Sequence, residues 1–181
     1  RRWALPSLLF LPIAFEIVSG NVHLLYAAVI VVGFRWPAAW ALPLLTKVTP
    51  GVGVLWFLVR REWRPFAIAT AATAAIALVS YVLDPGQWGR WIELLRGEAS
   101  GAGSAAFETV GWYIPIALGP RLVAAVAVVA FAAWTDRRWL VPVAVALAMP
   151  VLWANSLAVL AACVPLWLAR DADELASARQ P

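Results

Sequence analysis

The only lysine of this 181-residue chain, Lys47, lies in the middle of an apolar run from residue 37 to residue 59. An ionised lysine at membrane depth costs about 2.5–3.5 kcal/mol on insertion scales, so it needs a partner, a water-filled cavity or a short path to the surface. Residues 49–53, which follow it, read Thr-Pro-Gly-Val-Gly. Proline and glycine are the residues that most strongly interrupt helices. The sequence therefore predicts two short helical arms that meet at a break, with Lys47 at the break and its charge facing an anion.

The rest of the chain is apolar enough to be embedded in a membrane. Hydrophobic residues make up 64% of it and charged residues 13%, whereas soluble domains carry about 25% charged residues. The apolar runs cover about 3–19, 22–34, 37–59, 66–83, 112–134, 139–153 and 156–169. Several are shorter than the roughly 17–25 residues of a straight spanning helix, which is tolerated where short helices line an enclosed cavity. The predicted fold class is all-α, a polytopic integral membrane protein with short and broken transmembrane helices.

The arginines give this expected fold an orientation. If the chain starts in the cytoplasm and reverses at Lys47, ten of the fourteen basic residues fall on the cytoplasmic side, as the positive-inside rule requires. A straight helix over 37–59 would put Arg35 and Arg60 on opposite sides, so the charge bias independently favours the break. Ten of the twelve tryptophans then flank the ends of the apolar runs, as an aromatic belt does. The four basic residues left outside are Lys47, Arg90, Arg96 and Arg121.

We expect one transmembrane helical domain over residues 1–169, with an external segment at 84–111, and a cytoplasmic tail over residues 170–181. The external segment starts with Asp-Pro-Gly-Gln at 84–87, which is typical of a helix start with an aspartate cap. The apolar residues that follow recur at helical spacing, which predicts a helix lying in the outer interface with these residues toward lipid. They are Trp88, Trp91, Ile92 and Leu95, and the residues expected to face water are Arg90, Glu93 and Arg96. Residues 97–111 are expected to form a loop, either a solvated connector or a cover over a site.

Few polar residues fall in or beside the apolar runs, and in this threading all of them lie in the outer half. They are Glu16, Asn21, His23, Lys47, Thr49, Arg121 and Asn155. This one-sided distribution predicts a polar cavity open to the outside, in which Lys47 and Arg121 supply positive charge. A phosphate group suits such a cavity.

Plainer interpretations stand beside this one. Lys47 could snorkel to the surface, and Arg121 could be an ordinary interface anchor. Glu16 could only neutralise a cation, and His23 could be a hydrogen-bonded helix residue.

Other kinds of site have little support. With one histidine and one cysteine, Cys163, we expect no metal and no disulfide. The chain contains no Walker loop, no Gly-x-Gly-x-x-Gly motif and no Gly-x-Ser-x-Gly elbow. No cofactor and no nucleic-acid partner are therefore expected, and a sugar donor would have to be lipid-linked rather than a nucleotide sugar.

Three stretches resemble a known family. Residues 20–25, Gly-Asn-Val-His-Leu-Leu, resemble the Gly-Gln-Val-Asn-Leu-Leu element of glycosyltransferase family 87. Residues 45–50 and the Arg-Arg-Glu-Trp-Arg sequence at 60–64 resemble that family's Lys-x-x-Pro helix break and Arg-Arg-x-Trp-Arg turn. The resemblance covers most of the chain, and residues 20–64 are its specific part. Asn21 and His23 stand where the family usually has Gln and Asn.

The resemblance implies the C-terminal part of a GT-C class membrane glycosyltransferase. Such an enzyme transfers a mannose- or arabinofuranose-type sugar from a polyprenyl-phosphate donor to a lipid-linked or polysaccharide acceptor, here at the outer face of a bacterial plasma membrane. It implies that Lys47 lies close to the donor phosphate, and we expect Arg121 to assist. The residues expected to contact sugar or acceptor are Asn21, His23, Thr49 and Glu16. GT-C enzymes carry a catalytic carboxylate in a first external loop, which this chain lacks, so we expect the general base upstream of residue 1.

Two other classes of function fit the same features. A transporter or flippase for an anionic lipid or lipid-linked sugar would use a positive outer cavity and broken helices. A structural membrane subunit would need no site at all. A pseudo-symmetric second copy of the broken helix would favour the transporter, and the sequence shows none. An upstream outer-face loop that carries Asp or Glu would favour the enzyme.

Overall fold

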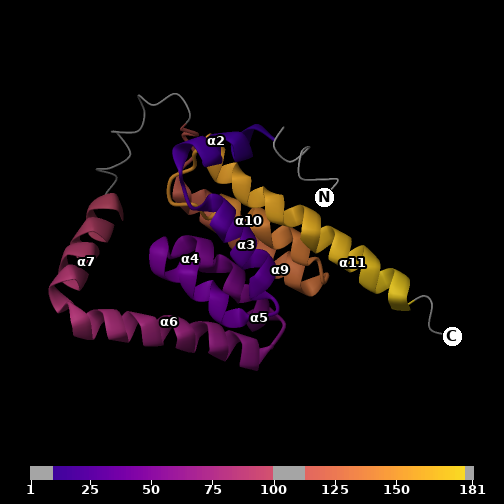
Figure 1. Cartoon of the computed structure of the whole chain (residues 1–181), viewed down its shortest axis with the longest axis horizontal. Coiled ribbons are helices and arrows are strands. Elements are labelled where there is room, and N and C mark those ends of the chain that lie inside the picture. The colour runs from indigo at the N-terminus through magenta and orange to yellow at the C-terminus, as the bar shows by residue number, and fades with distance from the viewer. Residues whose placement is uncertain (1–9, 100–112, 178–181) are drawn as a thin grey trace.

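The computed structural model describes residues 10–99 and 113–177, and this part of the chain is all-helical, as predicted. Short helices gather in one compact group, and α6 and α7 extend from it along one edge (Figure 1). The first elements are α2 (Leu11–Ser19), α3 (His23–Gly33), η1 (Pro37–Trp40), α4 (Ala41–Thr46), η2 (Thr49–Val54) and α5 (Leu55–Val59). They are followed by α6 (Trp63–Leu83), α7 (Pro85–Ala99), α9 (Leu118–Trp134), η3 (Arg138–Leu140), α10 (Val141–Leu147), η4 (Ala154–Ala162) and α11 (Cys163–Ser177).

The predicted helix break at Lys47 is confirmed. The helix α4 ends at Thr46 and η2 begins at Thr49, and the backbone reverses through Lys47 (φ −138°) and Val48 (φ 46°). A positive φ is costly for a β-branched residue such as valine, and strained residues of this kind concentrate at functional sites. The break is therefore a defined reversal of the chain rather than a frayed helix end.

The glycines after the break have a second role that the sequence did not indicate. A Cβ atom built on Gly51 would lie 2.2 Å from Leu44 Cδ2, and one built on Gly53 would lie 2.2 Å from Trp40 Cη2. Only residues without a side chain let η2 fold back this closely onto η1 and α4. Trp40 and Trp56 are fully buried there, each with Phe34 in an edge-to-face contact. Close packing in the core thus fixes the geometry of the break.

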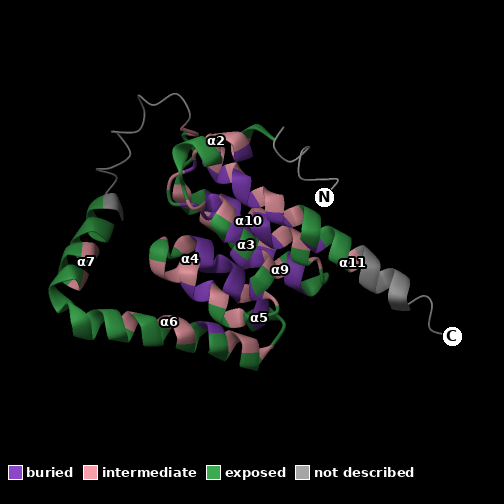
Figure 2. Cartoon of the chain, viewed as in Figure 1, coloured by how far each residue is buried: buried purple, intermediate pink, exposed green. Residues whose placement is uncertain are grey.

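The helix α6 is the one described helix that is long and apolar enough to cross a membrane. It has 21 residues, and only 6% of its most apolar stretch is buried in the protein. Figure 2 shows α6 largely exposed while buried residues concentrate in the short helices. The pair α2 and α3, bent by 112°, would count as a second span if taken together, and the other apolar helices have 10–17 residues.

The predicted external helix is present as α7, and its start follows the expected pattern. The Asp84 carboxylate accepts the backbone N–H of Gln87 at 3.1 Å, and Pro85 is the first helical residue. The predicted lipid-facing side is wrong in part, because Trp88 and Trp91 turn toward α6 and line a pocket there. Ring packing explains this orientation, since Trp88 contacts both Tyr81 of α6 and Trp91 edge-to-face.

Some expectations fall outside the described residues. They concern the N-terminal arginines and Trp3, Trp112, Arg179 and residues 100–111 of the loop expected over 97–111. The first three residues of that expected loop, 97–99, instead belong to α7. At the other end, α11 continues past residue 169 to Ser177, so the boundary expected for a separate tail falls inside a helix.

Candidate functional site

The turn between α2 and α3 brings Glu16 against His23. Gly20 ends α2 in the left-handed region (φ 61°, ψ 32°), and the chain then bends so that the start of α3 meets the side of α2. One carboxylate oxygen of Glu16 accepts the backbone N–H of His23, and the other lies 2.9 Å from His23 Nδ1. Both side chains are almost completely buried. A free N–H at a helix start and an imidazole N–H are thus both satisfied by one carboxylate.

The segment after α10 adds two more residues to this pair. Asn155 Nδ2 donates to Glu16 Oε2 at 3.0 Å and to Ser19 Oγ at 3.2 Å. The fully buried hydroxyl of Ser156 lies 3.3 Å from His23 Nε2, and it accepts the backbone N–H of Trp153. The start of η4 is therefore joined to α2 and α3 through polar side chains.

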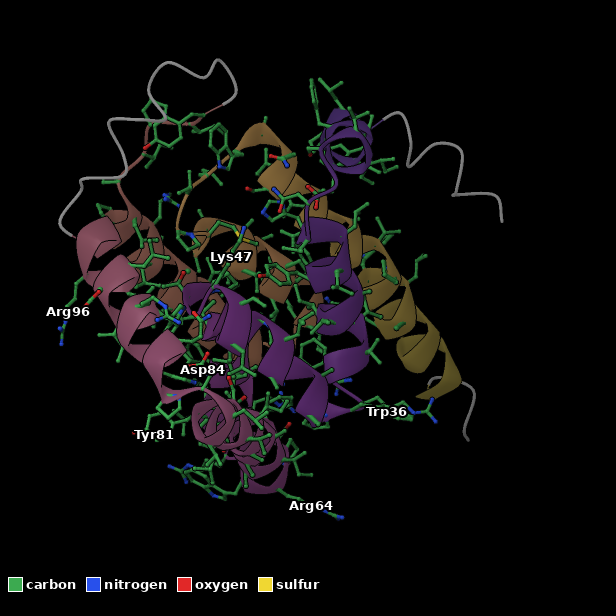
Figure 3. All side chains as sticks on the ribbon, turned by 60° about the vertical axis from the view of Figure 1, so that its left-hand side comes forward. Trp36, Lys47, Arg64, Tyr81, Asp84 and Arg96 are labelled. Carbon is green, nitrogen blue, oxygen red and sulfur yellow. The ribbon has the colours of Figure 1, made fainter. Side chains whose placement is uncertain are left out.

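Lys47 completes the network from the break after α4. Its Nζ lies 3.3 Å from His23 Nε2. Lys47 is half-buried, and among the described residues it has no ion pair and no other side-chain hydrogen bond. Figure 3 shows Lys47 inside the outline of the molecule, whereas Trp36, Arg64 and Arg96 point outward. An ammonium carries three donors, so two of those on Lys47 have no partner in the described part of the protein.

Arg121, the second cation predicted for the site, is used differently. Its guanidinium donates to four backbone carbonyls, and its side chain is 6% exposed. The carbonyls belong to Ile116, Leu147, Met149 and Pro150, at 2.7–3.2 Å. Among the described residues, no hydrogen bond or ion pair joins Arg121 to Lys47. These donors hold the turn that leads from α10 to η4, and the assistance of Arg121 at a phosphate stays a prediction.

Two further predicted contacts also lie outside the network. The exposed Asn21 accepts the backbone N–H of the next residue, Val22, at 2.9 Å. Thr49 donates to the carbonyl of Lys47 at 3.3 Å, within the break itself. Both side chains act on the local backbone, and neither contacts Glu16 or His23 in the structure.

No pattern in the sequence indicated a site role for Ser156 or Ser19. Ser156 is 133 residues from His23, and a serine at a turn is common, so nothing in the sequence linked the two. The neighbouring Asn155 was among the polar residues predicted for the outer half, and it was the only available indication of this contact.

An apolar pocket of about 350 Å³ lies between α4, α6 and α7. Two tryptophans and four aliphatic side chains dominate its lining. Its residues are Leu44, Leu45, Ile76, Ala77, Ser80, Gln87, Trp88 and Trp91. The last turns of α4, which contribute Leu44 and Leu45, lead directly to Lys47, so the pocket and the cation share one short helix.

These features define an all-helical protein. Its lysine at a helix break keeps two donors without a partner among the described residues, and the helix before the break lines an apolar pocket. The model of glycosyltransferase family 87 matches residues 1–179, essentially the whole sequence. The chain belongs to glycosyltransferase family 87. Neither a curated protein nor a solved structure matches it.

Family membership has consequences for the site. It indicates a glycosyltransferase, which requires a sugar donor and an acceptor, and the family's glycosyltransferases are generally membrane proteins. The largely exposed apolar helix α6 agrees with membrane association. Of the three classes of function considered, the match favours the glycosyltransferase over the transporter and the structural subunit.

Proposed function

We propose that this chain takes part in transfer of a mannose- or arabinofuranose-type sugar from a polyprenyl-phosphate donor to a lipid-linked or polysaccharide acceptor, at the outer face of a bacterial plasma membrane. The observation that carries the proposal is the half-buried ammonium of Lys47 at a strained helix break, with two donors that have no partner among residues 10–99 and 113–177. A hydrogen bond is strongest when both partners are charged, and phosphate oxygens are strong hydrogen-bond acceptors.

In the proposed reaction, an acceptor hydroxyl attacks the anomeric carbon of the donor sugar and the bond from that carbon to the phosphate oxygen breaks. The hydroxyl proton goes to a general base that we do not assign among these residues. Negative charge grows on the departing polyprenyl phosphate, and the ammonium of Lys47 stabilises it. Configuration at the anomeric carbon inverts, because the attack is a single displacement.

The apolar pocket supports a donor with a lipid tail. Its volume of about 350 Å³ is within the range of roughly 300–1,000 Å³ that is typical of small-molecule sites. Leu44 and Leu45 line the pocket, and Lys47 follows them at the end of α4. An amphiphile with an anionic head and an isoprenoid tail fits this order of side chains.

A multi-pass arrangement is part of the proposal, with the break at Lys47 outside and the turn at residues 60–64 in the cytoplasm. The large exposed surfaces of Trp36, Trp63 and Trp134 support it, because tryptophans of an aromatic belt face the lipid interface. Cysteines placed at positions 62 and 101 in a Cys163→Ala background test it. An impermeant thiol reagent added outside intact cells should label position 101 and spare position 62, and labelling at 62 would overturn the threading.

The role of Lys47 is tested by two substitutions in the intact protein. Lys47→Met keeps the stem and removes the charge, and turnover with a polyprenyl-phosphate sugar should fall by about 10²–10³, the usual effect of removing one donor from a developing oxyanion. Lys47→Arg should keep part of the activity, because the charge survives but its geometry changes. The matched control is Arg96→Met, which removes an exposed cation of α7 and should leave turnover unchanged. Wild-type turnover in Lys47→Met would refute the role of Lys47 at the phosphate.

A further inference from the structure

We propose that Glu16 and His23 form a positioning pair for Lys47, in which a neutral imidazole takes one donor of the ammonium, holds it in place and leaves its other two donors for an anion. The inference rests on the proposed function, since it assumes that Lys47 meets a phosphate. It adds two residues whose role is to act through Lys47 and which do not themselves touch the donor.

The first step is that Glu16 is a fixed anchor. Three N–H groups point at its carboxylate: the backbone N–H of His23, His23 Nδ1 at 2.9 Å and Asn155 Nδ2 at 3.0 Å. Glu16 is 2% exposed, and donors from α3 and η4 hold both of its oxygens. A carboxylate enclosed in this way cannot turn toward a ligand. Its effect on the site has to pass through His23.

The second step is the tautomer of His23. A carboxylate only accepts hydrogen bonds, so the proton between Glu16 and His23 belongs on Nδ1. The other ring nitrogen, Nε2, then presents its lone pair, and the structure places Lys47 Nζ 3.3 Å from it. The ammonium donates one N–H to the ring and keeps two for an anion. Because His23 is fully buried and its ring is fixed by Glu16, the end of the lysine side chain has a defined position.

The third step is that this hold leaves the ammonium available to a phosphate. A direct ion pair between Glu16 and Lys47 would compete with a phosphate for the ammonium, whereas a neutral imidazole is a poorer acceptor than a phosphate oxygen. The Ser156 hydroxyl also lies 3.3 Å from Nε2. The Ser156 hydroxyl can donate to the same lone pair, so this buried acceptor keeps a partner while the ammonium adjusts to the anion. The charge of Glu16 meanwhile offsets that of the half-buried ammonium before a donor binds.

Two substitutions of His23 separate positioning from simple structural support. The amide of an asparagine lies near the position of Nδ1, so His23→Asn can still donate to Glu16 but cannot reach Lys47. The amide of a glutamine lies near the position of Nε2, so His23→Gln can still accept from Lys47 but loses the side-chain hydrogen bond to Glu16. The pair therefore forms its own matched control, because each variant keeps one of the two contacts.

The binding experiment uses the intact protein in nanodiscs, with undecaprenyl phosphate as the probe and undecaprenol as the control without the anion. Holding one flexible side chain in place is worth about threefold to tenfold in affinity. We expect His23→Asn to weaken undecaprenyl phosphate binding by that factor and His23→Gln to stay within about twofold of wild type. Undecaprenol binding should not change in either variant. Thermal stability should rank the other way, with His23→Gln the less stable, because the contact with Glu16 is lost there.

The outcomes distinguish the two proposals. If Lys47→Met binds undecaprenyl phosphate as tightly as wild type, the proposed function of Lys47 fails. If Lys47→Met weakens binding but His23→Asn does not, the positioning role alone is overturned. The same holds if the affinities of the two His23 variants rank in the same order as their thermal stabilities. Should neither His23 variant fold, the ¹⁵N NMR signals of the His23 ring in the wild-type protein decide. A neutral ring protonated at Nδ1 supports the proposal, and a proton on Nε2 overturns it.

Discussion

Two regions of this molecule each enclose a cation within apolar surroundings, and they use it in opposite ways. At the start of α9, Arg121 donates to four carbonyls, and its side chain is buried. At the break after α4, Lys47 is half-buried, and His23 is its single side-chain partner within the part of the chain that the structure describes. Sequence alone gave both residues the same role, because each is a basic residue beside an apolar run.

The difference teaches that the location of a cation does not by itself mark a binding site. What matters is how many of its donors the protein leaves unused. Carbonyls at the end of a short helix such as α10 lack partners within the helix, and an arginine fork suits them well. A lysine at a reversal of the chain offers three donors, of which the described part of this protein uses one. This difference is why we propose a ligand for Lys47, whereas the four bonds of Arg121 serve the fold.

The largest effect expected from this contrast is on stability. Arg121→Met leaves four carbonyls without their donor, which should cost about 3–5 kcal/mol in the free energy of unfolding, as for other buried charged groups that lose their partner. Lys47→Met removes one long hydrogen bond and should cost less than about 1 kcal/mol. Denaturant unfolding in detergent measures both. Equal losses in the two variants would remove the distinction between the two cations.

Exchanging the two cation types should give intermediate effects. Arg121→Lys keeps the charge but replaces a planar fork of donors by a compact ammonium, so it should cost about 2 kcal/mol. Lys47→Arg should leave stability nearly unchanged while activity falls in part. The measurement is unfolding of both variants beside turnover with a polyprenyl-phosphate sugar. A lower stability of Lys47→Arg than of Arg121→Lys would contradict the difference between the two cations.

A smaller effect than that of either Arg121 variant concerns Ser156, which supports the network near Lys47 without carrying charge. Ser156→Ala leaves the backbone N–H of Trp153 without its acceptor, and loss of such a capping contact costs about 1 kcal/mol. The same unfolding experiment should therefore rank Ser156→Ala above Lys47→Met in damage. The reverse order would mean that Lys47 contributes more than the Ser156 contact of η4 to the stability of this network.

Local chemistry made part of the structure predictable. The Thr-Pro-Gly-Val-Gly stretch at residues 49–53 indicated the break, and the Asp-Pro-Gly-Gln stretch at 84–87 indicated the capped start of α7. Both depend on the conformational limits of proline and glycine and on a side chain that reaches three residues along the chain. The helical spacing of Trp88 and Trp91 was also correct, but the surface that covers them was not. Periodicity reports which residues share a face and not what that face meets.

The sequence by itself determined an all-helical protein of glycosyltransferase family 87, with an unusual lysine at a broken helix. Only the tertiary structure decided which polar residues meet. Asn155 reaches Glu16 across 139 positions of sequence, and Ser156 reaches His23 across 133, through the packing of η4 against α2 and α3. The physical reason is that a hydrogen bond depends on distance and direction within about 3 Å, and chain packing sets these for residues so far apart. The same reason explains why Arg121 and Lys47, alike in sequence context, differ in the number of donors left for a ligand.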